Sequence, residues 1–165
     1  MNTASFIRQS LQTSRELALG LANDLRDAPL VQPSASGGNH ALWILGHITY
    51  SESTLFDSFV LGKPNRCAEW AKVFGITSIP SADAGLYPSF DDVVPVWEQI
   101  RADVLTHLDT LRDDDFAAKS HAPDAYSDGF GSVGKCYAAM VFHPGFHAGQ
   151  LAVIRKSLNR DPLRA

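Results

Sequence analysis

The feature that most constrains the fold is a run of apolar residues spaced three and four positions apart between residues 93 and 111. This spacing places side chains on one face of an α-helix, whereas a β-strand would need strict alternation. A helix with one apolar face has to bury that face against other elements. The apolar set comprises Val93, Trp97, Ile100, Val104, Leu108 and Leu111.

Three further segments also show helical spacing. The first covers residues 3–27, where leucines recur at every fourth position. The second covers residues 39–61, with Asn39 as its predicted N-cap, and the last begins after the N-cap residue Ser132. The predicted apolar set of the first segment is Phe6, Ile7, Leu11, Leu17, Leu21 and Leu25.

Long connections separate these helices. The third helix is predicted to begin near Ser89, because Ser89 and Asp92 have the spacing of a capping box. Residues 63–88 form a connection rich in proline and glycine, and residues 116–131 form a second irregular one. The sequence therefore predicts an all-α fold, namely an antiparallel four-helix bundle with at least one long crossover, and a single domain over residues 1–165.

Composition excludes several functional classes. The net charge is −4, and no basic run offers partners for phosphates, so we expect no nucleic-acid binding. The apolar runs are too short and too interrupted to cross a bilayer, so we expect no membrane partner. Cys67 and Cys136 cannot form a disulfide framework, and no apolar signal region follows Met1. These features predict a cytoplasmic protein.

Two histidines four residues apart, His143 and His147, share one face of the last predicted helix. Both imidazoles can therefore point at one metal ion, but such sites need three or more donors. His47 lies in an apolar helical stretch and is the candidate third ligand. His40, His107 and His121 are interpreted instead as a first-turn residue, a residue at the edge of its helix's apolar face and a loop residue.

Pro144 interrupts the helical pattern between the two histidines. Proline lacks the N–H that would bond to the Met140 carbonyl, and its ring clashes with that turn. Gly145 weakens the helix further. Either the helix is kinked or starts again at Pro144, or the interruption sets the angle between the two imidazoles.

Two motifs resemble the DinB-like superfamily, the DinB/YfiT metal-binding four-helix bundles. One is H-x-x-x-H-x-G-Q-L-x-x-x-R, which here comprises His143, His147, Gly149, Gln150, Leu151 and Arg155. The other is W-x-x-G-H-I, with Trp43, Gly46 and His47. The resemblance implies that His47, His143 and His147 bind a divalent metal, usually zinc or nickel, and that the protein is a homodimer. Pro144-Gly145 departs from the bulkier residues that are frequent between the ligands.

Three neutral imidazoles leave the charge of a metal uncompensated, so the ion remains a strong Lewis acid. Hydrolysis usually also needs a carboxylate base, but residues 144–146 supply none and Glu52 and Asp57 do not share the His47 face. The inward face of the third helix is predicted to carry no ionisable side chain. Such a site is better suited to a low-molecular-weight thiol, whose pKa a metal lowers.

The resemblance favours the same chemistry, because characterised members include transferases and isomerases that use thiols such as bacillithiol or mycothiol. The prediction is a metal-dependent thiol S-transferase acting on small electrophiles in stress or detoxification. Gln150 is a candidate contact to His147 or substrate, or a helix–helix hydrogen bond. Tyr50 and Tyr126 are weaker candidates for lining the pocket, with a packing role favoured for each, and Cys136 is interpreted as a buried thiol.

Two alternatives remain open. The first is metal-dependent hydrolysis of a small amide or ester, with a base supplied by residues 65–88 or 118–130. The second is a metal-binding bundle without catalytic activity.

Overall fold

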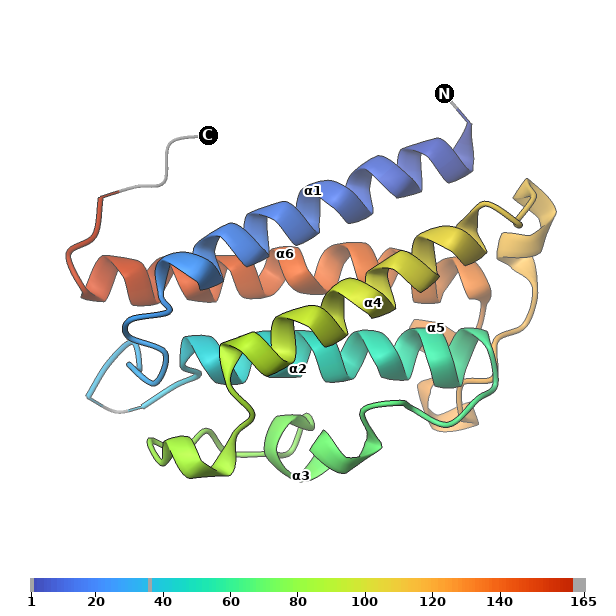
Figure 1. Ribbon diagram of the computed structural model, residues 1–165. Coiled ribbons are helices and arrows are strands. Elements are labelled where there is room, and N and C mark those ends of the chain that lie inside the picture. Colours follow the sequence, from blue (N-terminus) through green and yellow to red (C-terminus); the bar gives the residue numbers. More distant parts are fainter. Residues whose placement is uncertain (1, 36, 162–165) are drawn as a thin grey trace.

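Figure 1 presents the computed structural model, in which residues 2–35 and 37–161 are described. Every named element in these ranges is helical, which confirms the all-α prediction. Ser36, part of the connection before the second predicted helix, lies outside the described residues, as do Met1 and residues 162–165. The four long helices are α1 (Thr3–Asp24), α2 (Ala41–Ser53), α4 (Phe90–Leu108) and α6 (Val133–Ser157).

The helices form a bundle with one long crossover. α1 and α6 run in one direction, and α2 and α4 run in the other (Figure 1). After α2 the chain therefore has to return along the bundle before α4 can begin, which explains the length of this connection. The predicted crossover is confirmed, although the adjacent helices α2 and α4 are parallel rather than antiparallel. The connection contains three short helices: η2 (Ala68–Trp70), α3 (Ala71–Phe74) and η3 (Ala84–Leu86).

The second long connection joins the end of α4 to the start of α6 at one end of the bundle (Figure 1). It combines irregular chain, including residues 118–123, with three short helices that the sequence did not predict: η4 (Asp113–Ala117), η5 (Asp124–Tyr126) and α5 (Ser127–Phe130).

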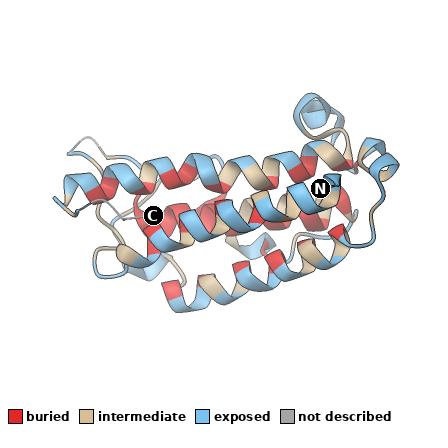
Figure 2. Cartoon of the chain, turned by 90° about the horizontal axis from the view of Figure 1, so that it is seen from above, coloured by how far each residue is buried: buried red, intermediate tan, exposed pale blue. Residues whose placement is uncertain are grey.

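Buried residues line the inner faces of the long helices (Figure 2). The apolar face predicted for the third helix is confirmed for five of its six residues, because Val93, Trp97, Ile100, Val104 and Leu108 are completely buried. Leu111 lies beyond the end of α4 and is only partly buried.

The prediction for the first helix is partly wrong. Leu11, Leu21 and Leu25 are buried, whereas Phe6 and Leu17 are more than half exposed. A strict four-residue repeat drifts around a helix that has 3.6 residues per turn, so Leu17 turns away from the face that buries Leu21.

The predicted helix ends are close to the observed ones. The capping box of Ser89 and Asp92 begins α4, and the Ser132 hydroxyl caps α6. The N-cap of α2 is His40 rather than Asn39, because the His40 ring nitrogen Nδ1 accepts a hydrogen bond from the Trp43 amide. α2 continues as a π-helix, η1 (Thr54–Val60).

The expectation that the inner face of α4 lacks ionisable groups is wrong. Arg101 is only 2% exposed, and its Nη2 donates to Glu52 Oε2 on α2 at 2.6 Å. Arg101 lies four residues after Trp97, at the edge of the apolar face. A buried charge needs a partner, and this partner comes from another helix, so the pattern of α4 alone could not reveal it.

In the described part of the chain, no helix combines the length and apolar character needed to cross a membrane.

Candidate metal centre

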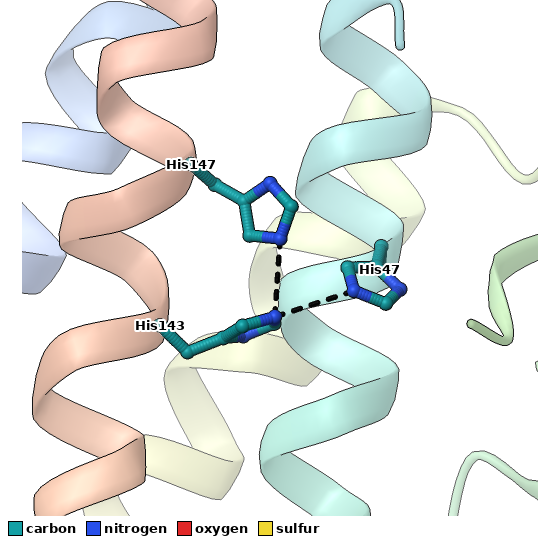
Figure 3. Close-up of side chains that lie close together, drawn as sticks. All are labelled: His47, His143 and His147. Atoms are coloured by element: carbon teal, nitrogen blue, oxygen red, sulfur yellow. Dashed lines mark hydrogen bonds between the residues drawn. The ribbon is translucent and has the colours of Figure 1, made fainter.

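Three histidines from two neighbouring helices meet inside the bundle (Figure 3). α2 carries His47, and α6 carries His143 and His147 one turn apart. The Nε2 atom of His143 lies 3.2 Å from Nε2 of His47 and 3.0 Å from Nε2 of His147. One ring nitrogen from each histidine lies within 4.8 Å of a ring nitrogen from each of the other two. The structure thus brings together all three histidines that the sequence selected.

Hydrogen bonds to the opposite ring nitrogens orient two of these imidazoles. His47 Nδ1 lies 2.7 Å from the Phe74 carbonyl oxygen, and His147 Nδ1 lies 2.9 Å from Gln150 Oε1. Both partners are acceptors, so both Nδ1 atoms carry the proton and both Nε2 atoms present a lone pair to the centre. Asn39 Nδ2 also donates to Gln150 Oε1, at 3.2 Å, which fixes the orientation of that amide.

The arrangement of the donors fits a cation. A neutral His143 has at most one Nε2 proton to share between the lone pairs of His47 and His147. A metal ion would satisfy all three lone pairs at once. Two nitrogens bound to zinc at about 2.0–2.1 Å in tetrahedral geometry lie about 3.3 Å apart, close to the two observed separations.

Burial keeps these imidazoles neutral. Burial, assisted by the neighbouring His147 and His47, lowers the pKa of His143 to about 3. Burial also lowers the pKa of His147 to about 4, although the hydrogen bond that His147 donates to Gln150 opposes this effect. The pKa of His47 is lowered by burial, against the opposing effect of the Phe74 carbonyl. Neutral imidazole is the form that binds metals.

The crossover connection holds His47 in place. The Trp43 ring stacks on the His47 ring, with centroids 4.6 Å apart, and Trp43 Nε1 donates to Ser78 Oγ at 2.9 Å. A Cβ atom on Gly46 would lie only 2.2 Å from the Phe74 ring, so only glycine permits this approach. The W-x-x-G-H motif therefore has a structural explanation. The contribution of Phe74 and Ser78 has no counterpart in the sequence pattern, because both contacts depend on how the crossover folds back.

Pro144 does not divide the last helix. α6 is continuous from Val133 to Ser157, so the interpretation that the helix starts again at Pro144 is wrong. The hypothesis that Pro144 sets the angle between the two imidazoles stays a prediction.

The remaining histidines lie outside the three-histidine group. His40 is fully buried, and its Nε2 lies 3.0 Å from the Ser81 carbonyl oxygen. His107 Nδ1 lies 2.8 Å from the Tyr137 hydroxyl, and the backbone amide of His121 donates to the Phe59 carbonyl.

Four other side chains named from the sequence have structural contacts. Tyr50 is partly buried against the core, whereas Tyr126 is 55% exposed and stacks on Phe59. Cys136 is a buried thiol, as predicted, and burial raises its pKa to about 11. Gln150 contacts His147 on its own helix and Asn39 from the connection before α2.

The histidine group contains no Asp or Glu among residues 2–35 and 37–161. Glu52 bonds to Arg101 and Trp97, and Asp57 bonds to Arg66. The crossover reaches the group through a backbone carbonyl rather than through a carboxylate.

The fold and the histidine group together define a class, a helical bundle with a site that could hold a metal ion. The sequence profile of the DinB superfamily matches residues 10–151. The chain therefore belongs to the DinB superfamily, and the matched region includes all three histidines. A comparison with curated proteins found no match.

Proposed function

We propose that His47, His143 and His147 bind one divalent transition metal, zinc or nickel, through their Nε2 atoms. The observation that carries this proposal is the convergence of the three Nε2 atoms while the Nδ1 protons of His47 and His147 are donated elsewhere. Three neutral ligands leave the charge of the ion uncompensated. Such an ion acts as a Lewis acid and lowers the pKa of a thiol that occupies its open position.

The finer proposal is a thiol S-transferase that acts on small electrophiles, with a low-molecular-weight thiol as co-substrate. In this reaction the thiol proton passes to solvent, sulfur bonds to the electrophilic carbon, and the leaving group departs with its bonding electron pair. The absence of Asp and Glu from the histidine group, within the described ranges, favours an acidic nucleophile over hydrolysis assisted by a carboxylate base. The role in stress or detoxification, the homodimer and the cytoplasmic location remain part of this proposal.

Elemental analysis of untagged protein that has never contacted a nickel column tests the metal. We expect about one equivalent of transition metal in the parent and almost none in a His143→Ala/His147→Ala variant. A parent that remains empty after zinc and nickel are added contradicts the metal proposal.

Activity assays test the finer proposal. The metal-loaded protein is incubated with a small thiol and an alkyl halide or epoxide, and loss of free thiol is followed. We expect turnover that the double histidine variant lacks. Turnover of amide or ester substrates without thiol would instead support the hydrolase alternative, and no turnover of either class would support a non-catalytic bundle.

A further inference from the structure

Pro144 leaves the Met140 carbonyl without its usual donor. In a regular helix this oxygen would accept the N–H of the residue four positions later, which proline does not have. The carbonyl is not left without a partner, because Arg101 Nη2 on α4 donates to it at 3.4 Å. Met140 lies three residues before His143, so this bond acts on the turn of α6 that leads into the histidine pair.

The same guanidinium reaches the other helices of the bundle. Arg101 Nη1 donates to the Leu11 carbonyl on α1 at 3.3 Å, and Nη2 donates to Glu52 Oε2 on α2 at 2.6 Å. Trp97 Nε1 donates to the same Glu52 oxygen at 2.8 Å. Glu52 lies on the helix that carries His47. One side chain therefore ties the His47 helix to the turn of α6 before His143.

A contribution to folding stability does not by itself explain this ion pair. Arg101 and Glu52 are both about 2% exposed, and two charges removed from water rarely add net stability compared with well-packed apolar residues. Glu52 Oε1 and Arg101 Nε also have no hydrogen-bond partner in the described part of the chain. Buried polar atoms without partners oppose folding. A positional role accounts better for the pair.

We propose that Arg101 is a positioning residue for the histidine group, supplying to Met140 the donor that Pro144 withdraws and locking α6 to α2 through Glu52. This inference rests on the proposed metal site. It predicts that substitutions of Arg101 and Pro144 have non-additive effects on zinc affinity. A residue with an N–H at position 144 would supply to the Met140 carbonyl the hydrogen bond that Arg101 otherwise donates.

Zinc affinity measured in a double-mutant cycle tests this coupling. Arg101→Met/Glu52→Gln removes the ion pair and leaves no unpaired charge. Pro144→Ala is introduced both into this variant and into the parent. We expect the ion-pair variant to bind zinc at least tenfold more weakly than the parent. Pro144→Ala should recover at least threefold in that variant and change the affinity of the parent by less than threefold. The absorption bands of bound cobalt(II) should shift in the ion-pair variant and should return toward those of the parent when Pro144→Ala is added.

Asp57→Asn/Arg66→Met is the matched control, because it removes another ion pair with a buried carboxylate from the α2–η1 segment, together with the bond from Arg66 to Asp103. In the described part of the chain, the side-chain hydrogen bonds of Asp57 and Arg66 do not reach α6. Its zinc affinity should equal that of the parent. The inference is overturned if the Arg101 variant binds zinc as the parent does, or if Pro144→Ala has the same effect with and without Arg101.

Two further measurements keep the inference testable. Arg101→Lys serves if the double variant does not fold. It should lose some zinc affinity because one ammonium cannot reach all three acceptors, but less than the double variant because the charge is kept.

Amide exchange over residues 140–147 in metal-free protein separates this inference from the proposed function. A parent without zinc affinity refutes the metal site, whereas exchange that Arg101→Lys does not accelerate refutes the positioning role.

Discussion

His147 uses its two ring nitrogens for different purposes. Nε2 faces the other histidines, and Nδ1 donates to Gln150 Oε1. Gln150 in turn accepts from Asn39, so its amide oxygen is fixed toward His147. An acceptor behind a ligating imidazole fixes the tautomer and raises the basicity of the coordinating nitrogen.

Gln150→Ala removes this acceptor without touching the three Nε2 atoms. We expect zinc affinity to fall by about 10–100-fold, the range typical for groups behind a metal ligand. Competition with a chromophoric chelator measures the change. Gln150→Glu is the matched control, because it keeps an acceptor oxygen and should retain affinity close to the parent. Equal losses in both variants would contradict the hydrogen-bond explanation.

The lowered pKa values of His143 and His147 predict an effect of pH on the metal-free protein. The unfolded chain binds protons below the ordinary histidine pKa of about 6.5, whereas the folded chain resists protonation down to about 3 to 4. The free energy of unfolding should therefore decrease as pH falls from about 6.5 to about 4, by up to about 1.4 kcal/mol per pH unit for each histidine.

Urea unfolding at several pH values in the presence of a chelator measures this slope. A His143→Gln/His147→Gln variant should show a shallower slope, because its amides do not titrate. An unchanged slope in this variant would mean that other groups cause the pH dependence.

At the scale of elements, the site depends on close packing between α2 and the crossover. Gly46 lets the Phe74 ring, which is completely buried, lie directly against α2. The Phe74 carbonyl then reaches His47 Nδ1. A glycine on a helix face thus fixes the position of a hydrogen-bond acceptor that belongs to a different element.

Gly46→Ala should disturb this contact, because the new methyl group would overlap the Phe74 ring. We expect a loss of about 1–3 kcal/mol in the free energy of unfolding, typical of an overpacked core, together with weaker zinc binding. Gly145→Ala is the control, since a Cβ there meets nothing within 4 Å. It should raise stability by up to about 1 kcal/mol through better helix propensity. Chemical denaturation measures both, and a harmless Gly46→Ala would refute the packing argument.

At the scale of the whole molecule, the histidine group joins α2 to α6, which lie far apart in sequence. An ion bound there would connect the second helix of the bundle to the last. A ligand that binds only the folded chain stabilises it by about 2.7 kcal/mol at a free concentration of 100 times its Kd.

Zinc should therefore raise the melting temperature. At that concentration we expect a rise of about 5–10 °C for a chain of this size. Differential scanning calorimetry with and without zinc measures the shift, and His147→Ala should lose most of it. A shift of equal size in His147→Ala would place the bound zinc elsewhere on the protein.

The sequence by itself determined the helical class, most helix ends and the three histidines of the group. Each of these follows from local rules: apolar spacing marks a helix face, side-chain oxygens cap helix ends, and a four-residue separation aligns His143 with His147. The long crossover was also predictable, because its proline and glycine content breaks helices.

Only the tertiary structure decided which side chains and backbone atoms meet between the helices. Three contacts join elements that are distant in sequence: the hydrogen bond between His47 and the Phe74 carbonyl, the Glu52–Arg101 ion pair, and the bond from Arg101 to Met140. The burial of Arg101 could not be read from α4, because the helix pattern shows only where a side chain leaves the backbone. Its environment depends on the partners that the other helices bring, and those are fixed only when the bundle packs.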